Sequence, residues 1–268
     1  MQRNSQIQPL QSGTVLIIGS APEVVSIADQ KIPAGCDLFA INNAWRVHPD
    51  TKNMIIPGDF PEKNLPPPER GMSILRGRQT GRSIENAGGP LFCGTTMVFV
   101  AGYFSIWGFT PRQINIFGCN MVYQGEKTHF YGLGSPDPLT KSIYTYPGKR
   151  NLLAKSVRLF AFGAIQNKLV LNANPQSGSQ LFLPPMPNLP LPGEQIEKVL
   201  CSHVVGSLMR DAIEVFNFER KFPGNRYALD LSVVSRSEEM IGFIDQVDNK
   251  WEALGHKYYE EIEALLKQ

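Results

Sequence analysis

Cysteine is scarce in this sequence, and its spacing excludes two kinds of site. The 268 residues include four cysteines, Cys36, Cys93, Cys119 and Cys201, which lie far apart without a Cys-x-x-Cys pair. A structural zinc site or a tight disulfide framework needs cysteines at closer, regular spacing. We therefore expect no bound metal on these residues and a reducing, cytoplasmic location.

Excess charge and long apolar runs are also missing. The 26 Lys and Arg residues against 24 Asp and Glu residues give a formal net charge of +2, too little for the basic surface of a nucleic-acid-binding protein. A membrane span needs about 20 consecutive apolar residues, and the longest candidate, Met97 to Phe109, is shorter. The polar N-terminal segment lacks the apolar stretch of a signal peptide. These features predict a protein that neither binds nucleic acid nor crosses a membrane.

Glycine and proline, in contrast, are abundant. The 24 glycines and 21 prolines place many residues in turns and shaped loops. Hydrophobic residues make up 42% and charged residues 19% of the chain, which is typical of a soluble globular protein. The chain is also long enough to build a large hydrophobic core.

Short apolar runs that end in turn residues recur along the chain, at 14–18, 37–41, 53–56, 114–117 and 168–171. Helices are predicted at 23–30, 97–107 and 150–166, and loops at 61–90 and 121–149. Four arginines of the first loop predict either a solvated loop or a lid over an anionic substrate: Arg70, Arg76, Arg78 and Arg82. The order of elements predicts an α/β fold, with a mainly parallel sheet, flanking helices and a Rossmann-type nucleotide-binding core.

A proline-rich segment, 174–193, separates two parts of different character. We expect the nucleotide-binding core at 1–173 and a mainly helical C-terminal region at 194–268. In that region, apolar residues from Met240 to Tyr258 recur at alternating spacings of four and three, as in a heptad repeat. The pattern fits an amphipathic helix docked on its own core, or a helix through which copies of the chain form a homo-oligomer.

The turns after the strands are the candidate binding groups. Gly19 to Pro22 follows a strand and precedes a helix, where backbone N–H groups favour an anion or a nucleotide. Neither G-x-G-x-x-G nor G-K-[ST] is present. Because the carboxyl ends of parallel strands share one edge, the turns can converge there. Their Asn and Ser side chains suit a ribose and a base edge better than a metal, so we expect a metal-independent site.

Together, the segments VLIIGSAPEV, CDLFAINNAWRV and FCGTTMVFVAGYFSIWGFTPRQINIFGCNMVYQG resemble glycosyltransferase family 42, the bacterial sialyltransferases, and their motility-accessory relatives. The shared pattern is a strand with G-[NS]-[GA]-P, a strand ending in an Asn-rich turn, a turn opening a buried helix, and a strand with G-x-[DN]. It covers residues 14–172. The resemblance implies a GT-A-like domain that transfers a nonulosonic acid from a cytidine-monophosphate (CMP) sugar to an acceptor hydroxyl of a surface glycan, by inversion and without a cofactor. Such an enzyme would be cytoplasmic, or peripheral to the inner membrane.

The resemblance also implies roles for individual residues. Carried over, Gly19 and Ser20 would meet the phosphate or ribose, Asn42 the nucleotide, Cys93, Gly94 and Thr95 the sugar or its carboxylate, and Gly118 with Asn120 the cytidine. The family has Asp where this chain has Asn120, which keeps the hydrogen bonding and removes a charge. Cys93 is also open to a second interpretation, as a packing residue.

The catalytic histidine of the family has no counterpart in its expected place, where Tyr144 to Lys149 stand instead. His129 is the nearby imidazole, and its ordinary pKa suits the deprotonation of an acceptor hydroxyl. Tyr144 and Tyr146 are candidates to hold the leaving phosphate. Two other functions stay open: a non-catalytic nucleotide- or glycan-binding protein, and a methyltransferase using S-adenosylmethionine. The second is disfavoured because Asn42 stands where that class has an acidic residue.

Overall fold

The protein is built around one parallel sheet. The computed structural model describes residues 13–109, 111–122, 127–132, 151–186, 190–225 and 237–268. The sheet has six strands in the order β4-β3-β2-β1-β5-β6, and every neighbouring pair is parallel. The strands are β1 (Thr14–Ile18), β2 (Cys36–Ile41), β3 (Asn53–Ile56), β4 (Ser73–Arg76), β5 (Gln113–Phe117) and β6 (Leu169–Asn172). The predicted α/β fold with a Rossmann-like core is confirmed at this level.

Alternating side chains of the strands enter two different cores. Val15 and Ile17 of β1 face the larger apolar cluster, whereas Leu16 and Ile18 face the smaller one. This is the period of two that a strand imposes on its side chains. Because both faces are covered, the strands are nearly continuous apolar runs, which is why the sequence revealed them.

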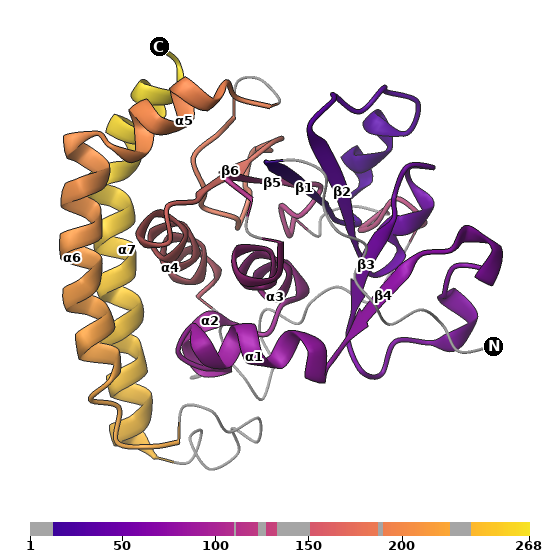
Figure 1. The fold of residues 1–268 in the computed structure, drawn as a ribbon. Helices are drawn as coiled ribbons and strands as arrows, with labels where there is room; N and C mark the ends of the chain where they lie inside the picture. Colours follow the sequence, from indigo (N-terminus) through magenta and orange to yellow (C-terminus); the bar gives the residue numbers. More distant parts are fainter. Residues whose placement is uncertain (1–12, 110, 123–126, 133–150, 187–189, 226–236) are drawn as a thin grey trace.

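The two faces of the sheet have different covers (Figure 1). On one face, helices α3 (Met97–Phe104) and α4 (Leu152–Ile165) lie against the strands, and α6 (His203–Glu219) and α7 (Glu238–Leu266) form an outer layer on α4. The other face has short helical turns, including η1 (Pro22–Ile27) and η2 (Asn42–Arg46). The remaining elements are η3 (Glu62–Asn64), η4 (Pro68–Arg70), α1 (Arg78–Asn86), α2 (Pro90–Cys93), η5 (Ser105–Phe109) and α5 (Gly193–Leu200).

The segment predicted as a long loop, 61–90, contains regular structure. Edge strand β4 pairs with β3, and α1 and α2 follow it. Two of its arginines already have partners: Arg70 donates to the carbonyl oxygens of His48 and Pro49, and Arg76 lies 3.0 Å from Glu62. The prediction of a continuous loop was wrong because a four-residue strand and a polar helix give little periodicity.

The C-terminal helices share the core of the sheet. The C-terminal region predicted as mainly helical begins with two successive helices, α5 and α6, because Ser202 caps α6 by accepting a hydrogen bond from Val205 N. Apolar residues of α4, α6 and α7 belong to the same cluster as the strands.

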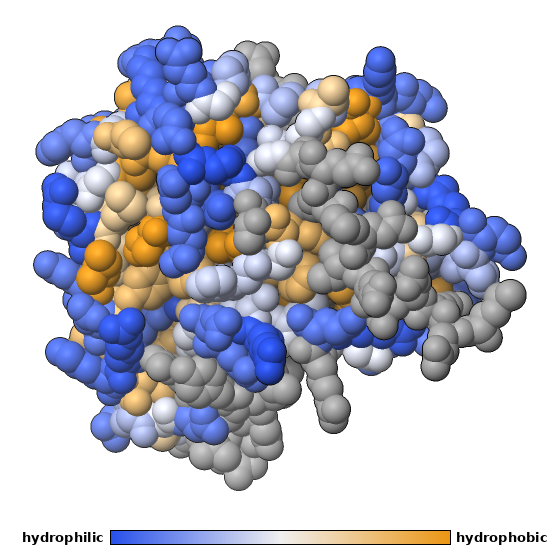
Figure 2. All heavy atoms as spheres, viewed as in Figure 1, coloured by the Kyte–Doolittle hydropathy of each residue, from blue (hydrophilic) through white to orange (hydrophobic). Residues whose placement is uncertain are grey.

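Figure 2 shows an outer surface of mixed polar and apolar residues over α6, where Ile213 is 48% exposed. None of the described helices is long and apolar enough to cross a membrane.

The heptad pattern of α7 faces the chain's own core. Ser237 caps the helix by accepting from Met240 N, and Ile244, Val247 and Trp251 of the repeat are at most 1% exposed. Helices α4 and α6 cover this row of residues. The interpretation as a docked amphipathic helix is therefore the one the structure supports, and self-association through another face of α7 stays a prediction.

A charged cluster lies inside this three-helix contact. The guanidinium of Arg158 is fully buried and bonds both carboxylate oxygens of Glu219, each at 2.8 Å. Its other N–H groups reach the Tyr103 hydroxyl, the Cys93 thiol and the Ala87 carbonyl. Because all five guanidinium donors have acceptors, the charge is compensated where no water reaches it.

Candidate functional site

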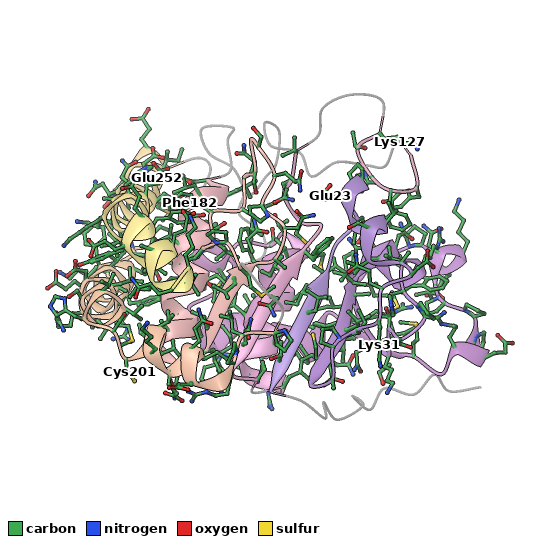
Figure 3. The ribbon with its side chains drawn as sticks, turned by 90° about the horizontal axis from the view of Figure 1, so that it is seen from above. Glu23, Lys31, Lys127, Phe182, Cys201 and Glu252 are labelled. Carbon is green, nitrogen blue, oxygen red and sulfur yellow. The ribbon has the colours of Figure 1, made fainter. Side chains whose placement is uncertain are left out.

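The candidate site is at the carboxyl ends of the strands, where the strand order reverses. This position is the switch point of the sheet. From β1 the chain builds the sheet through β2, β3 and β4 to one side, and later through β5 and β6 to the other. The turns after β1 and β5 therefore lie side by side at the position where doubly wound sheets bind ligands. In Figure 3, Glu23 and Lys127 lie at this edge of the sheet, and Lys31 lies at the opposite edge.

The two turns touch through glycine. Gly19 N donates to Phe117 O at 2.8 Å, and Ala21 N donates to Gly118 O at 2.9 Å. A Cβ on Gly19 would lie 2.3 Å from both Gly118 O and Cys119 Sγ, so no larger residue fits. Gly118 has a φ of +65° and a Cβ there would lie 2.8 Å from Val24. The structure thus brings Gly19, Ser20 and Gly118 together, as predicted from the order of the motifs.

Asn120, the third residue of the β5 turn, is 1% exposed. Its amide nitrogen donates to Glu23 Oε1 at 2.6 Å and to Asn174 O at 3.0 Å. Its amide oxygen accepts from Ser179 Oγ at 2.8 Å and from Asn172 Nδ2 at 3.3 Å. The side chain is at the predicted place, but its hydrogen-bonding groups already hold the loop after β6 and orient Glu23.

Asn42 begins the turn after β2, beside the turn of β1. Ile18 pairs with Ala40 in the ladder, so Asn42 lies at the same edge, and its φ of 54° is the left-handed conformation. The amide oxygens of Asn42 and Asn43 are buried without a hydrogen-bond partner among the described residues. A buried acceptor without a partner costs free energy unless a donor, such as a water or a ligand, meets it.

The connection from α2 to α3 follows Cys93, the last residue of α2, and includes Gly94 and Thr95. The Cys93 thiol is fully buried against Arg158, and burial raises the pKa of this thiol above its ordinary value. Gly94 has a φ of +80°, and a Cβ there would lie 2.9 Å from the Phe99 ring. The structure therefore places Cys93 in the core rather than with the strand-end turns, in agreement with its interpretation as a packing residue. Thr95 is half-buried just before α3.

His129 lies on a short loop that docks on the β1 turn. Phe130 N donates to Ser20 O at 3.0 Å, and His129 N donates to Gly132 O. The imidazole Nδ1 lies 2.9 Å from Thr128 Oγ1, and the ring stacks on Tyr131 with 5.1 Å between centroids. Partial burial lowers the pKa of His129, which favours the neutral imidazole that can accept a proton near pH 7.

The last predicted site residues are the two tyrosines expected to hold the leaving phosphate. Tyr144 and Tyr146 lie outside the described residues. In the described part of the chain, Tyr131 is the tyrosine beside His129, and it is 41% exposed. No group of three or more His, Cys, Asp or Glu side chains in that part is arranged to hold a metal ion.

One residue of the site was missed in the sequence. Glu23 was predicted only as part of a helix, yet its carboxylate lies at the switch point and contacts Asn120. The signal was its place directly after Gly19 to Pro22, in the first turn of η1. Its contact with Asn120 spans 97 residues, so only the tertiary structure could reveal it.

Comparisons with known proteins identify no relative of this chain. No protein-family model matches the sequence, and neither a curated protein nor a solved structure is significantly similar to it. The resemblance to glycosyltransferase family 42 therefore stays a prediction, and the function is argued from the site.

Proposed function

We propose that this protein is a metal-independent glycosyltransferase with a GT-A-like core, which transfers a nonulosonic acid from a CMP-sugar to an acceptor hydroxyl of a glycan. The observation that carries the proposal is the meeting of three segments at one edge: the β1 turn, the β5 turn and the loop of His129. The unpartnered amide oxygens after β2 add acceptors for a nucleotide at the same edge. The specific donor follows from the sequence resemblance.

In the proposed reaction, the acceptor hydroxyl attacks the anomeric carbon of the sugar directly. The C–O bond to the CMP phosphate breaks, CMP leaves with the bonding electron pair, and the configuration inverts. His129 takes the proton of the attacking hydroxyl, because burial holds its imidazole neutral. Thr128 and Tyr131 hold the ring in place.

The first test of this proposal is nucleotide binding. CMP present at about ten times its Kd should add about 1.4 kcal/mol to the free energy of unfolding, seen as a raised Tm and confirmed by calorimetry. S-adenosylmethionine serves as the comparison ligand for the methyltransferase alternative. If CMP at millimolar concentration does not stabilise the protein, the proposal is wrong.

The second test is turnover. His129→Asn should lower kcat by about 10²-fold or more, the usual contribution of a general base, with an unchanged Kd for CMP. His203→Asn is the matched control, because His203 is exposed on α6, and it should leave both values unchanged. Full turnover by His129→Asn would remove His129 from the mechanism.

A non-catalytic nucleotide- or glycan-binding protein is the second candidate function. Two of the residues carried over from the resemblance have structural partners instead: the Asn120 amide holds the loop after β6, and the Cys93 thiol contacts Arg158. CMP binding without transfer or hydrolysis of any CMP-sugar would favour this candidate.

A further inference from the structure

Glu23 places a carboxylate at the switch point, held in a fixed orientation. Its Oε1 accepts from Asn120 Nδ2 at 2.6 Å, and Asn120 is itself buried and oriented by Ser179 and Asn172. Glu23 is half-buried, and Figure 3 shows it at the carboxyl edge of the sheet. Its Oε2 has no hydrogen-bond donor among the described residues. One carboxylate oxygen is thus positioned by the protein, and the other can accept from a ligand.

This chain has no acidic residue at the position where related folds place their ribose-binding carboxylate, the end of the second strand. Doubly wound folds commonly hold the ribose hydroxyls with an acidic residue at the end of the second strand, and β2 is followed by Asn42 instead. Asp59, after β3, is a carboxylate at the same edge, but it is exposed and lies two strands away from β1. Glu23, in contrast, lies directly after the β1 turn and contacts Asn120 of the β5 turn.

The charge of Glu23 also distinguishes the two ligand groups that the β1 turn could meet. A phosphate beside this carboxylate would be repelled, since like charges at close range disfavour one another. A ribose offers hydroxyl donors, which a carboxylate binds strongly. We propose that Glu23 accepts hydrogen bonds from the ribose hydroxyls of the nucleotide, and that the Gly19–Ser20 turn faces the ribose and not the phosphate. This assignment rests on the proposed function, because it requires a nucleotide at the switch point.

The test compares CMP with its 2′,3′-dideoxy analogue in three proteins by calorimetry. The wild type should bind CMP about tenfold or more tightly than the analogue, the range for one hydrogen bond to a charged group. Glu23→Gln keeps an acceptor for Asn120, should weaken CMP binding about tenfold, and should bind the analogue as the wild type does. Asp59→Asn, a carboxylate removed from the same edge, should behave as the wild type.

The outcomes separate the two proposals. If the wild type binds neither ligand, the proposed function fails, and the role of Glu23 fails with it. If the wild type binds CMP and Glu23→Gln binds CMP equally well, nucleotide binding stands and the assignment of Glu23 is wrong. An equal loss for both ligands in Glu23→Gln also overturns the assignment, because a contact to the ribose hydroxyls must discriminate between them.

Discussion

Two polar regions of this molecule are built in opposite ways. The Arg158–Glu219 cluster, between α4 and α6, is fully buried, and every guanidinium donor has an acceptor. The carboxyl edge of the sheet, in contrast, leaves the amide oxygens of Asn42 and Asn43 without partners. A satisfied buried network fixes one packing, whereas the unpartnered amide oxygens at the strand edge are free to accept from a ligand. Polarity alone therefore does not mark a functional residue in this protein, because the buried polar cluster has a structural role.

The buried cluster offers the largest expected effect. Glu219→Ala leaves the Arg158 charge and the Trp251 indole N–H, which donates to Glu219 at 2.8 Å, without their acceptor. We expect a loss of about 3–5 kcal/mol in the free energy of unfolding, measured with urea. Lys257→Met is the control, because it removes an ion pair whose Lys257 side chain is 60% exposed, and it should cost less than about 1 kcal/mol. Equal effects of the two variants would show that the satisfied buried network contributes no more to stability than an exposed ion pair.

The contact between the β1 and β5 turns predicts an intermediate effect. Gly19→Ala forces a Cβ against backbone at 2.3 Å, so the turns must separate, at a cost of about 1–3 kcal/mol as for other overpacked sites. The control is Gly242→Ala on α7, where nothing lies within 4 Å of the added Cβ. That variant should stabilise the protein by about 0.5–1 kcal/mol through helix propensity. A tolerated Gly19→Ala, with unchanged Tm and unchanged CMP binding, would show that the turns do not need this close approach.

The smallest expected effect is the titration of His129. Burial lowers the pKa of His129 in the folded protein from its ordinary 6.5, so the folded state resists protonation more than the unfolded state does. The contribution to stability is therefore complete above pH 6.5 and is lost as the pH falls through and below that value. An NMR titration of the imidazole should give a midpoint below 6.5. A midpoint above 6.5 would mean that a negative charge, and not burial, dominates its surroundings.

The sequence predicted most of the sheet because the strands are buried on both faces. Five of its strands are nearly continuous apolar runs followed by turn residues, and their order led to the prediction of a parallel Rossmann-like core. Edge strand β4 was missed, since its four residues, Ser73–Arg76, alternate in burial and lie between polar segments. The glycine turns of the site were found for the same reason as the strands, because each directly follows an apolar run.

The sequence could not assign partners to the polar residues. Arg158 lies within a helix of apolar spacing, and nothing in that pattern points to Glu219, 61 residues later. The heptad repeat of α7 likewise fitted both a docked helix and an interface between copies. Helices α4 and α6 cover it in the folded chain, which a pattern on one helix cannot show.

Apolar periodicity and turn residues act locally on the backbone, so the amino-acid sequence was enough to locate five strands and the turns that follow them. The role of each polar side chain depends instead on the tertiary structure. It used Asn120 to hold a loop and orient Glu23, placed Cys93 beside a buried arginine, and brought the His129 loop to Ser20. Hydrogen bonds and ion pairs act over a few ångströms in space, and here they join residues that the chain separates by dozens of positions.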